Sequence, residues 1–430
     1  MQSQPQSPIC LRAPLLLAII WISIGVGCGD DFDDDLTEVR SSTPRNTEPT
    51  VKPRQLREVY APNRRAFALE MYHQLVAANP YDNMVYGPHS ITTAMAMAYA
   101  GARGETADEI AQALSFEIAQ DELHHTINHD DLNLNSGSQP TLHSANAIWA
   151  QRGATLEATF LDTLASHYDR GVFTADFTSA PNRARQHINS WVSERTFKRI
   201  PNLLEDNQLT PSTHWVLVNA VSFDHNWAEP FDPELSIEGS FTRLDGSQVP
   251  ITAMRSLDTP RRYIQTDAVE GVWLDYAIPG KDNPPSLLIL APTEGTFTDF
   301  EASLDDAMLQ TLQAQSHQDM VDLVLPTFNL QTRHSLSSPL QAMGLRTMFT
   351  AEANFSGAFA DSSSHAITDL VHEAAIDVRE QGTATAATSI VVGDGAAASQ
   401  TVAITLDRPF IFLLVDDMRI LLMGRFITPP

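Results

Sequence analysis

The segment that decides the fold reads Glu380-Gln381-Gly382-Thr383-Ala384-Thr385-Ala386-Ala387-Thr388-Ser389. Residues 375–379 before it alternate apolar and polar side chains, which is typical of a half-buried strand. The segment holds no side chain larger than Glu, Gln or Thr, and an almost chargeless stretch at 390–400 follows it. Small side chains can lie exposed as a loop and can also enter a close-packed sheet without overpacking it. We therefore expect a surface loop that is able to become a strand.

Composition sets the broad class of the protein. The 430 residues are 43% hydrophobic and 19% charged, which allows a large core. The formal net charge of −26 argues against binding to nucleic acid, to anionic lipid headgroups or to sulfated polysaccharide, since all three are anionic.

The amino end is a targeting segment, which we place at residues 1–27. Arg12 precedes an apolar run at 15–22 that is short for a membrane span and fades into small residues. The ending Val26-Gly27-Cys28 is similar to a bacterial lipoprotein signal, in which Cys28 would be lipidated, although Gly25 stands where that pattern has Leu. Ordinary cleavage and an uncleaved anchor remain the alternatives. We expect an exported protein, either a cell-surface or outer-membrane lipoprotein or an extracellular one.

The segment after the signal is expected to be an acidic, polar and disordered tether over residues 28–56. It opens with an acidic cluster at 30–35, which lacks the Gly and the distal Glu of a calcium loop, and it continues with Ser, Thr and Pro. Cys10 and Cys28 are the two cysteines of the chain, and Cys10 leaves with the signal, so no internal disulfide can form.

Residues 57–430 are expected to form one α+β domain. Helical periodicity comes first, with a helix capped by Asn63, another opened by a capping box at Thr106, and helices at 160–168 and 182–197. Apolar strands follow, and the run 215–223 indicates a strand buried on both faces. Helices first and strands later, without a linker, are typical of a single α+β domain.

A search for catalytic residues finds no set that favours an enzyme. His124, His125 and His129 approach a metal-binding pattern, but acidic neighbours indicate a solvated helix. His372-Glu373 lacks the second His of a zinc-protease motif, and no nucleophile elbow, phosphate loop or dinucleotide fingerprint is present. After Cys28 there is no cysteine for thiol catalysis. We expect neither a metal nor a cofactor.

Several separated motifs, in order and at matching spacing, resemble the serpin family over residues 57–430. They are Asn83 to Ile91, Asn219 to Phe223 with Trp227 and Pro230-Phe231, Asn354 to Gly357, Val371 to Ala374, Glu380 to Ser389, Arg408 to Phe410, and Met423 to Phe426. The resemblance implies three β-sheets, about nine helices and an exposed reactive-centre loop. It also implies that a protease cleaves the loop as an acyl-enzyme, and that the loop then inserts into the main sheet of a metastable protein.

The resemblance assigns the residues that carry this mechanism. The hinge is Glu380, Gly382, Thr383, Thr385, Ala386 and Ala387. The shutter beneath the sheet is Ser90, Asn219 and His372, although His372 could also be an ordinary satisfied core histidine. Because a strand has period two, the residues that would face inward are Thr383, Thr385, Ala387, Ser389, Val391 and Gly393, all of them small or β-branched.

The chain departs from the family pattern at four positions. Thr385 replaces an alanine, Ala384 an acidic residue and Gly87 a serine, while Thr327 replaces a lysine that would face Glu380. The hydroxyl of Thr385 needs a hydrogen-bond partner once buried, which would slow insertion slightly.

The bond that a protease would cut follows from counting along the loop. Fourteen places after the hinge glycine lies Ala396, with Ala397 next, whereas counting back from Pro409 gives Ala398-Ser399. In both cases the residue before the bond is alanine, which suits elastase-like or subtilisin-like serine proteases with a shallow apolar pocket.

The sequence therefore predicts a monomeric serine protease inhibitor. A binding or structural serpin without inhibitory activity is the alternative, and a surface hydrolase has only the scattered histidines in its favour. The acidic helix near residues 121–125 argues against a heparin-like cofactor.

Overall fold

The computed structural model describes residues 37–52, 56–361, 365–367, 370–383, 401–416 and 419–429. Nine α-helices lie in this part of the chain: α2 (Ala61–Ala78), α3 (Pro88–Gly101), α4 (Gly104–Ala113), α5 (Gln120–Leu134), α6 (Ala158–Tyr168), α7 (Pro181–Arg195), α8 (Phe297–Ser303), α9 (Asp306–Ala314) and α10 (Ser337–Ala342). The predicted α+β class is confirmed.

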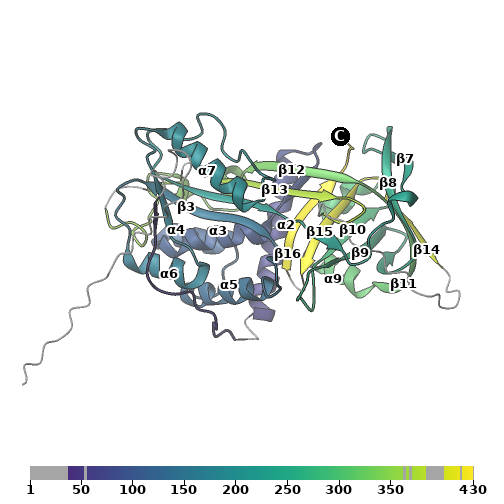
Figure 1. Ribbon diagram of the computed structural model, residues 1–430, viewed down its shortest axis with the longest axis horizontal. Coiled ribbons are helices and arrows are strands. Elements are labelled where there is room, and N and C mark those ends of the chain that lie inside the picture. The colour runs from purple at the N-terminus through teal and green to yellow at the C-terminus, as the bar shows by residue number, and fades with distance from the viewer. Residues whose placement is uncertain are drawn as a thin grey trace, which may run out of the picture.

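The main sheet contains six strands and carries the candidate site (Figure 1). Its strands, in spatial order, are β1 (Thr37–Val39), β4 (Val172–Ala175), β3 (His143–Gln151), β5 (Trp215–Ser222), β13 (Leu370–Val378) and β12 (Phe328–Ser335). β13 runs parallel to β5 and antiparallel to β12.

The second sheet has ten strands. They are β14 (Val402–Thr405), β11 (His317–Pro326), β8 (Gln248–Gln265), β9 (Val269–Ala277), β10 (Ser286–Pro292), β15 (Phe410–Asp416), β16 (Arg419–Phe426) and β2 (Met84–Tyr86), with β7 (Ile237–Thr242) on β8 and β6 (Asn226–Trp227) on β9. β8 has 18 residues. It pairs with β7 over residues 248–253, with β11 over residues 253–263 and with β9 over residues 263–265, which joins two of the three expected sheets into one.

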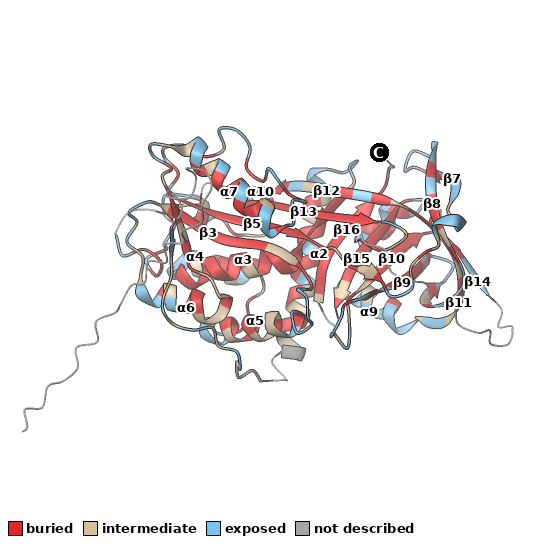
Figure 2. Cartoon of the chain, viewed as in Figure 1, coloured by how far each residue is buried: buried red, intermediate tan, exposed pale blue. Residues whose placement is uncertain are grey.

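Helices cover both faces of the main sheet (Figure 1). Along β5, Leu217 packs into the core that contains α3, and Val218 packs into the core that contains α7. This alternation explains why all eight residues of β5 are buried (Figure 2). The predicted strand buried on both faces is confirmed, with its end at Ser222 instead of residue 223.

Two predicted helix caps are wrong. α2 begins at Ala61, so Asn63 lies inside it, where its Nδ2 donates to the Ser115 carbonyl at 3.0 Å. α4 begins at Gly104, and the hydroxyl of Thr106 accepts the Asn354 amide at 2.9 Å. Both side chains connect distant segments of the chain, which local spacing does not reveal.

Residues 37–52 are ordered against the domain, which differs from the expectation of a disordered tether for this part of 28–56. β1 pairs antiparallel with the edge strand β4, and the Glu38 carboxylate accepts the Gly171 amide at 2.7 Å. Further along, Arg45 reaches α5 through Asn128 at 2.9 Å and Asp131 at 2.6 Å. The edge of β4 offers free backbone groups, and this segment satisfies them.

Candidate functional site

The hinge begins where β13 ends. The amides of Arg379 and Gly382 each donate to the other residue's carbonyl, at 2.9 and 3.0 Å, and so close a tight turn. The turn is tied to the neighbouring segment, because the Trp227 amide donates to the Gln381 carbonyl at 3.0 Å and the Phe231 amide to the Glu380 carbonyl at 2.8 Å.

Gly382 fits this turn because it has no side chain. Its φ is +127°, a conformation that other residues rarely adopt. A Cβ here would lie 2.5 Å from the His225 carbonyl oxygen and 2.6 Å from Asn226 Cα. Both contacts are with backbone, which cannot move aside cheaply, so glycine is required here.

Thr383 is already seated against the main sheet. Its side chain is 2% exposed, and its amide donates to the His225 carbonyl at 2.8 Å. The hydroxyl accepts the His225 amide at 2.8 Å and donates to the same carbonyl at 3.0 Å. The first small residue of the loop therefore occupies a position just beyond the end of β5.

Glu380 is held by a neutral partner. Its Oε1 accepts the Ser236 hydroxyl at 3.0 Å, and it forms no ion pair with any residue that the structure describes. Thr327 stands where the family pattern has a lysine that faces Glu380. Its backbone amide donates to the Thr252 carbonyl at 3.2 Å.

The main sheet parts directly beneath the hinge. β5 and β13 pair from Leu217 with Leu370 to Ser222 with Ala375, and beyond that point their pairing ends. Arg199 bridges the two strand ends there, with Asp224 at 3.2 Å and Asp377 at 3.3 Å. It also donates to the Thr383 carbonyl at 3.4 Å. β5 and β13 are therefore paired up to Ser222 and Ala375, and beyond these residues Arg199 connects them.

The predicted shutter residues lie together in one buried network. The side-chain Nδ2 of Asn219 donates to Ser90 Oγ at 2.9 Å and to Asn146 Oδ1 at 2.6 Å. Its Oδ1 accepts from His372 Nδ1. Asn146, Asn219, His372 and His334 occupy matching positions on β3, β5, β13 and β12. The network therefore spans the strands that insertion would separate.

The protonation state of His372 follows from its partners. Nε2 accepts the Gly87 amide at 2.9 Å, so in the neutral ring the proton sits on Nδ1 and is donated to Asn219. Burial, followed by the nearby His334, lowers the pKa of His372 well below its ordinary value. The shutter is a network of neutral groups.

Steric contacts explain why position 87 is a glycine in this chain. A Cβ at position 87 would lie 2.6 Å from Val221 Cγ1 and 3.5 Å from His372 Cε1. The serine that the family pattern has here would need the Val221 side chain to shift, whereas the distance to His372 is an ordinary contact.

Sequence reasoning missed three residues of this site, namely Asn146, His334 and Arg199. Asn146 is a polar residue within the apolar strand 145–150, which is a usable signal for a buried hydrogen bond. Arg199 lies in a loop after α7, and no local pattern points to its partners in β13.

The remaining predicted site residues lie outside the described part of the chain. They are Cys28, Thr385, Ala386, Ala387, Ala396, Ala397, Ala398 and Ser399.

The prediction of a solvated helix around His124 is wrong. His124 is 3% exposed, its Nδ1 bonds to the Tyr168 hydroxyl at 2.6 Å, and its ring stacks 6.1 Å from that of His167. Burial, and then His167 and His125, lower the pKa of His124 to about 3. No group of ligands suited to a metal ion occurs among the described residues.

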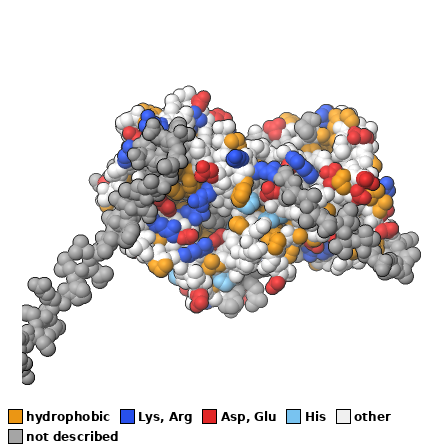
Figure 3. Space-filling model, in the orientation of Figure 1, with side chains coloured by type: hydrophobic (Ala, Val, Ile, Leu, Met, Phe, Trp, Pro, Cys, Tyr) orange, Lys and Arg blue, Asp and Glu red, His pale blue; other side chains and the backbone are white. Residues whose placement is uncertain are grey.

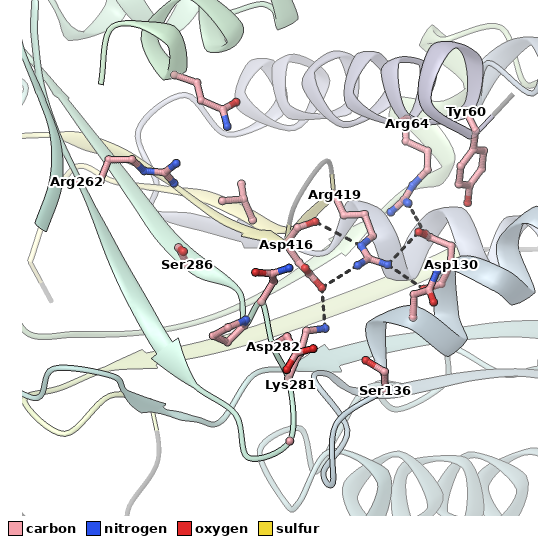
Figure 4. Close-up of a pocket in the computed structure, with 17 residues that line it drawn as sticks. Tyr60, Arg64, Asp130, Ser136, Arg262, Lys281, Asp282, Ser286, Asp416 and Arg419 are labelled. Atoms are coloured by element: carbon pink, nitrogen blue, oxygen red, sulfur yellow. Dashed lines mark hydrogen bonds and ion pairs between the residues drawn. The ribbon is translucent and has the colours of Figure 1, made fainter. Parts of the chain in front are cut away.

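A large polar cavity of about 880 Å³ lies apart from the hinge and is lined by paired charges (Figure 4). Asp130 pairs with Arg64 and with Arg419 (3.0 Å), while Asp416 pairs with Arg419 (3.0 Å) and with Lys281 (2.9 Å). Burial would raise the pKa of Asp130, but the two arginines outweigh it and the pKa lies below its ordinary value. These five charges connect α2, α5 and the β15–β16 hairpin, so we interpret them as structural.

On the face shown in Figure 3, Lys and Arg side chains are interspersed with Asp and Glu. The described helices include none that is long and apolar enough to cross a membrane.

The six-stranded main sheet and the hinge turn at the end of β13 define a class of fold, and comparison with known proteins identifies that class. A family model described as serpin (serine protease inhibitor) matches residues 62–429. The chain belongs to the serpin family.

Its relatives include prokaryotic and mammalian proteins. An uncharacterised serpin-like protein of Thermococcus kodakarensis is 31% identical, over 97% of this chain and 99% of its own length. The leukocyte elastase inhibitor of Bos taurus is 30% identical, over 84% of this chain and 97% of its own length.

Solved structures share the fold. Native tengpin, a thermophilic serpin, has a TM-score of 0.78 at 24% identity, covering 90% of this chain and 97% of its own. Thyroxine-binding globulin in complex with thyroxine has a TM-score of 0.77 at 26% identity, covering 86% and 99%.

Proposed function

We propose that this protein inhibits serine proteases by offering its loop for cleavage and then inserting the cleaved loop into the main sheet. The observation that carries this proposal is the opening between β5 and β13, with Thr383 already bonded to His225 at its edge. A strand that entered there would take over the backbone groups through which β5 and β13 now pair with each other, and the small residues after Thr383 could follow without overpacking.

The target is a protease with a shallow apolar pocket, elastase-like or subtilisin-like. The support is the alanine that precedes the bond at either predicted position, Ala396-Ala397 or Ala398-Ser399. The mammalian relative named leukocyte elastase inhibitor points to the same class of protease.

Mixing the purified protein with elastase, subtilisin and trypsin tests both proposals. We expect a covalent band at the summed mass on a denaturing gel with elastase or subtilisin, and none with trypsin. Mass spectrometry of the released carboxyl-terminal fragment would identify the cut bond. Cleavage of the loop without a covalent band would instead support the second candidate, a serpin that binds another molecule, as thyroxine-binding globulin does.

We further propose that the protein is exported and anchored through Cys28. The support is the apolar run at 15–22 followed by Val26-Gly27-Cys28. Expression with labelled palmitate should label the wild type and leave Cys28→Ala unlabelled. A wild type that carries no label and is released in soluble form would favour ordinary cleavage.

A further inference from the structure

Arg261 of β8 is a buried cation for which the described part of the chain provides no counterion at contact distance. Its side chain is 6% exposed, and it forms no ion pair with the residues that the structure describes. Nε has no hydrogen-bond partner among them, and Nη2 makes only a long contact of 3.4 Å to Ser256 Oγ. Burial lowers the pKa of Arg261 to about 10, so the side chain still carries its charge at neutral pH.

This guanidinium lines a cavity of about 470 Å³. The other lining residues are Ala228, Glu229, Pro260, Arg262, Trp273, Asp275 and Gln318. Arg262 adds a second cation, held 4.1 Å above the centre of the Trp273 ring, and it also borders the larger cavity of Figure 4.

The two acidic residues of the cavity do not neutralise these cations at contact distance. Glu229 and Asp275 are both exposed, and Asp275 Oδ1 is already bonded by the Ser286 hydroxyl at 2.5 Å. They attract Arg261 only from a distance, as their effect on its pKa shows. A buried charge with so few hydrogen bonds is costly, and a ligand that accepts from the Nη groups removes part of the cost.

The shape of the site selects the ligand. The Phe231 ring covers one face of the Arg261 guanidinium, with Cζ 5.1 Å from the ring centre, and the donors of a guanidinium lie in its plane. A ligand therefore meets the edge of the group, where oxygens of a carboxylate, phosphate or sulfate bind two donors at once. We propose that Arg261 is the anchor of a binding site for a compact oxyanion, with Arg262 at the border of the same cavity.

The site adjoins the segment that holds the hinge. Ala228 and Glu229 form its wall, and their neighbours Trp227 and Phe231 donate the hydrogen bonds to Gln381 and Glu380. An anion that fills the cavity packs against this segment and stabilises the native hinge. The proposal is independent of whether the protein inhibits a protease.

Thermal unfolding of the full chain at pH 7.5 tests the proposal, with sodium phosphate, sulfate or acetate added at constant ionic strength set by NaCl. Binding to the native state raises Tm, and we expect a rise of about 1 to 3 °C that saturates with concentration. Phosphate and sulfate acting without acetate would identify a tetrahedral anion, and acetate acting alone a carboxylate. No rise with any of the three would overturn the site.

The variant Arg261→Met tests whether Arg261 binds a ligand or only supports the fold. Removing an uncompensated buried charge should raise Tm in NaCl alone and should abolish the further rise with oxyanion. The matched control is Arg255→Met, on the same strand but outside the cavity, which should keep the full response. An Arg261→Met protein that melts lower than the wild type, or that still responds to the anion, would contradict the proposal.

Discussion

At the scale of single residues, Thr383 is the point at which the loop and the sheet first meet. Its hydroxyl and amide satisfy both backbone groups of His225, which is the first contact that the proposed insertion would need. Thr383 is 2% exposed where it lies, so a charged side chain at this position would be buried.

Thr383→Arg should convert an inhibitor into a substrate. Seating an arginine here buries an unpaired charge, at a cost of several kcal/mol, so insertion stalls and the protease completes hydrolysis. We expect the covalent band to fall at least tenfold while loop cleavage continues. Thr401→Arg, an exposed position beyond the other end of the loop, is the control and should keep the covalent band.

His372 should make the shutter sensitive to acid. A proton on Nε2 would face the N–H of Gly87, and two donors cannot form a hydrogen bond. Only the neutral ring therefore fits this site. With its folded pKa below the unfolded value, the histidine contributes stability that is complete above about pH 6.5 and is lost as pH falls below it. The loss from this residue therefore grows as the pH falls from 6.5 toward 5.

Thermal unfolding of wild type and His372→Gln at pH 7.5, 6 and 5 measures this contribution. Glutamine keeps a donor and an acceptor without titrating, so the variant should lose less free energy of unfolding than the wild type between pH 7.5 and 5. Other buried histidines, such as His124, act equally in both proteins. The partly exposed His129, replaced by Gln, serves as the control. An equal loss in wild type and His372→Gln would count against the tautomer deduced for the shutter.

At the scale of elements, the ends of β5 and β13 are joined by Arg199 instead of by backbone hydrogen bonds. The arginine is partly exposed, with 25% of its side chain accessible, so screening limits each of its ion pairs. Together with its bond to Thr383, it still restrains the opening through which a strand would enter.

Arg199→Met should loosen that opening. We expect a loss of about 1 kcal/mol, and hydrogen exchange of the amides in 376–383 should become about five- to tenfold faster. Arg185→Met is a suitable control, since Arg185 in α7 pairs with Asp206 instead of with the strand ends. Unchanged exchange in Arg199→Met would show that the arginine does not restrain the strands.

At the scale of the whole molecule, the proposed mechanism needs a native state that is less stable than the loop-inserted one. An inserted strand of about twelve residues adds roughly as many backbone hydrogen bonds, each worth about 1 kcal/mol. Cleavage of the loop should therefore raise Tm by more than about 10 °C.

Calorimetry before and after limited cleavage with elastase gives the comparison. The cleaved Thr383→Arg protein provides the control, because its loop is cut but cannot insert, and its Tm should stay within a few degrees of the uncleaved value. If the cleaved wild type melts at the uncleaved temperature, the native state is not metastable.

The sequence by itself determined the class of fold, the family and the buried strand 215–222, and it predicted a hinge of which Glu380, Gly382 and Thr383 lie in the described part of the chain. These features follow from local periodicity and from motifs in which the local backbone conformation requires a particular residue type, as it does at Gly382. Only the tertiary structure placed Asn146 and His334 in the shutter, buried His124, paired β1 with β4 and showed Arg261 buried with no ion pair to any described residue. These features depend on contacts between residues far apart in the chain, and such contacts leave no periodic trace in the sequence.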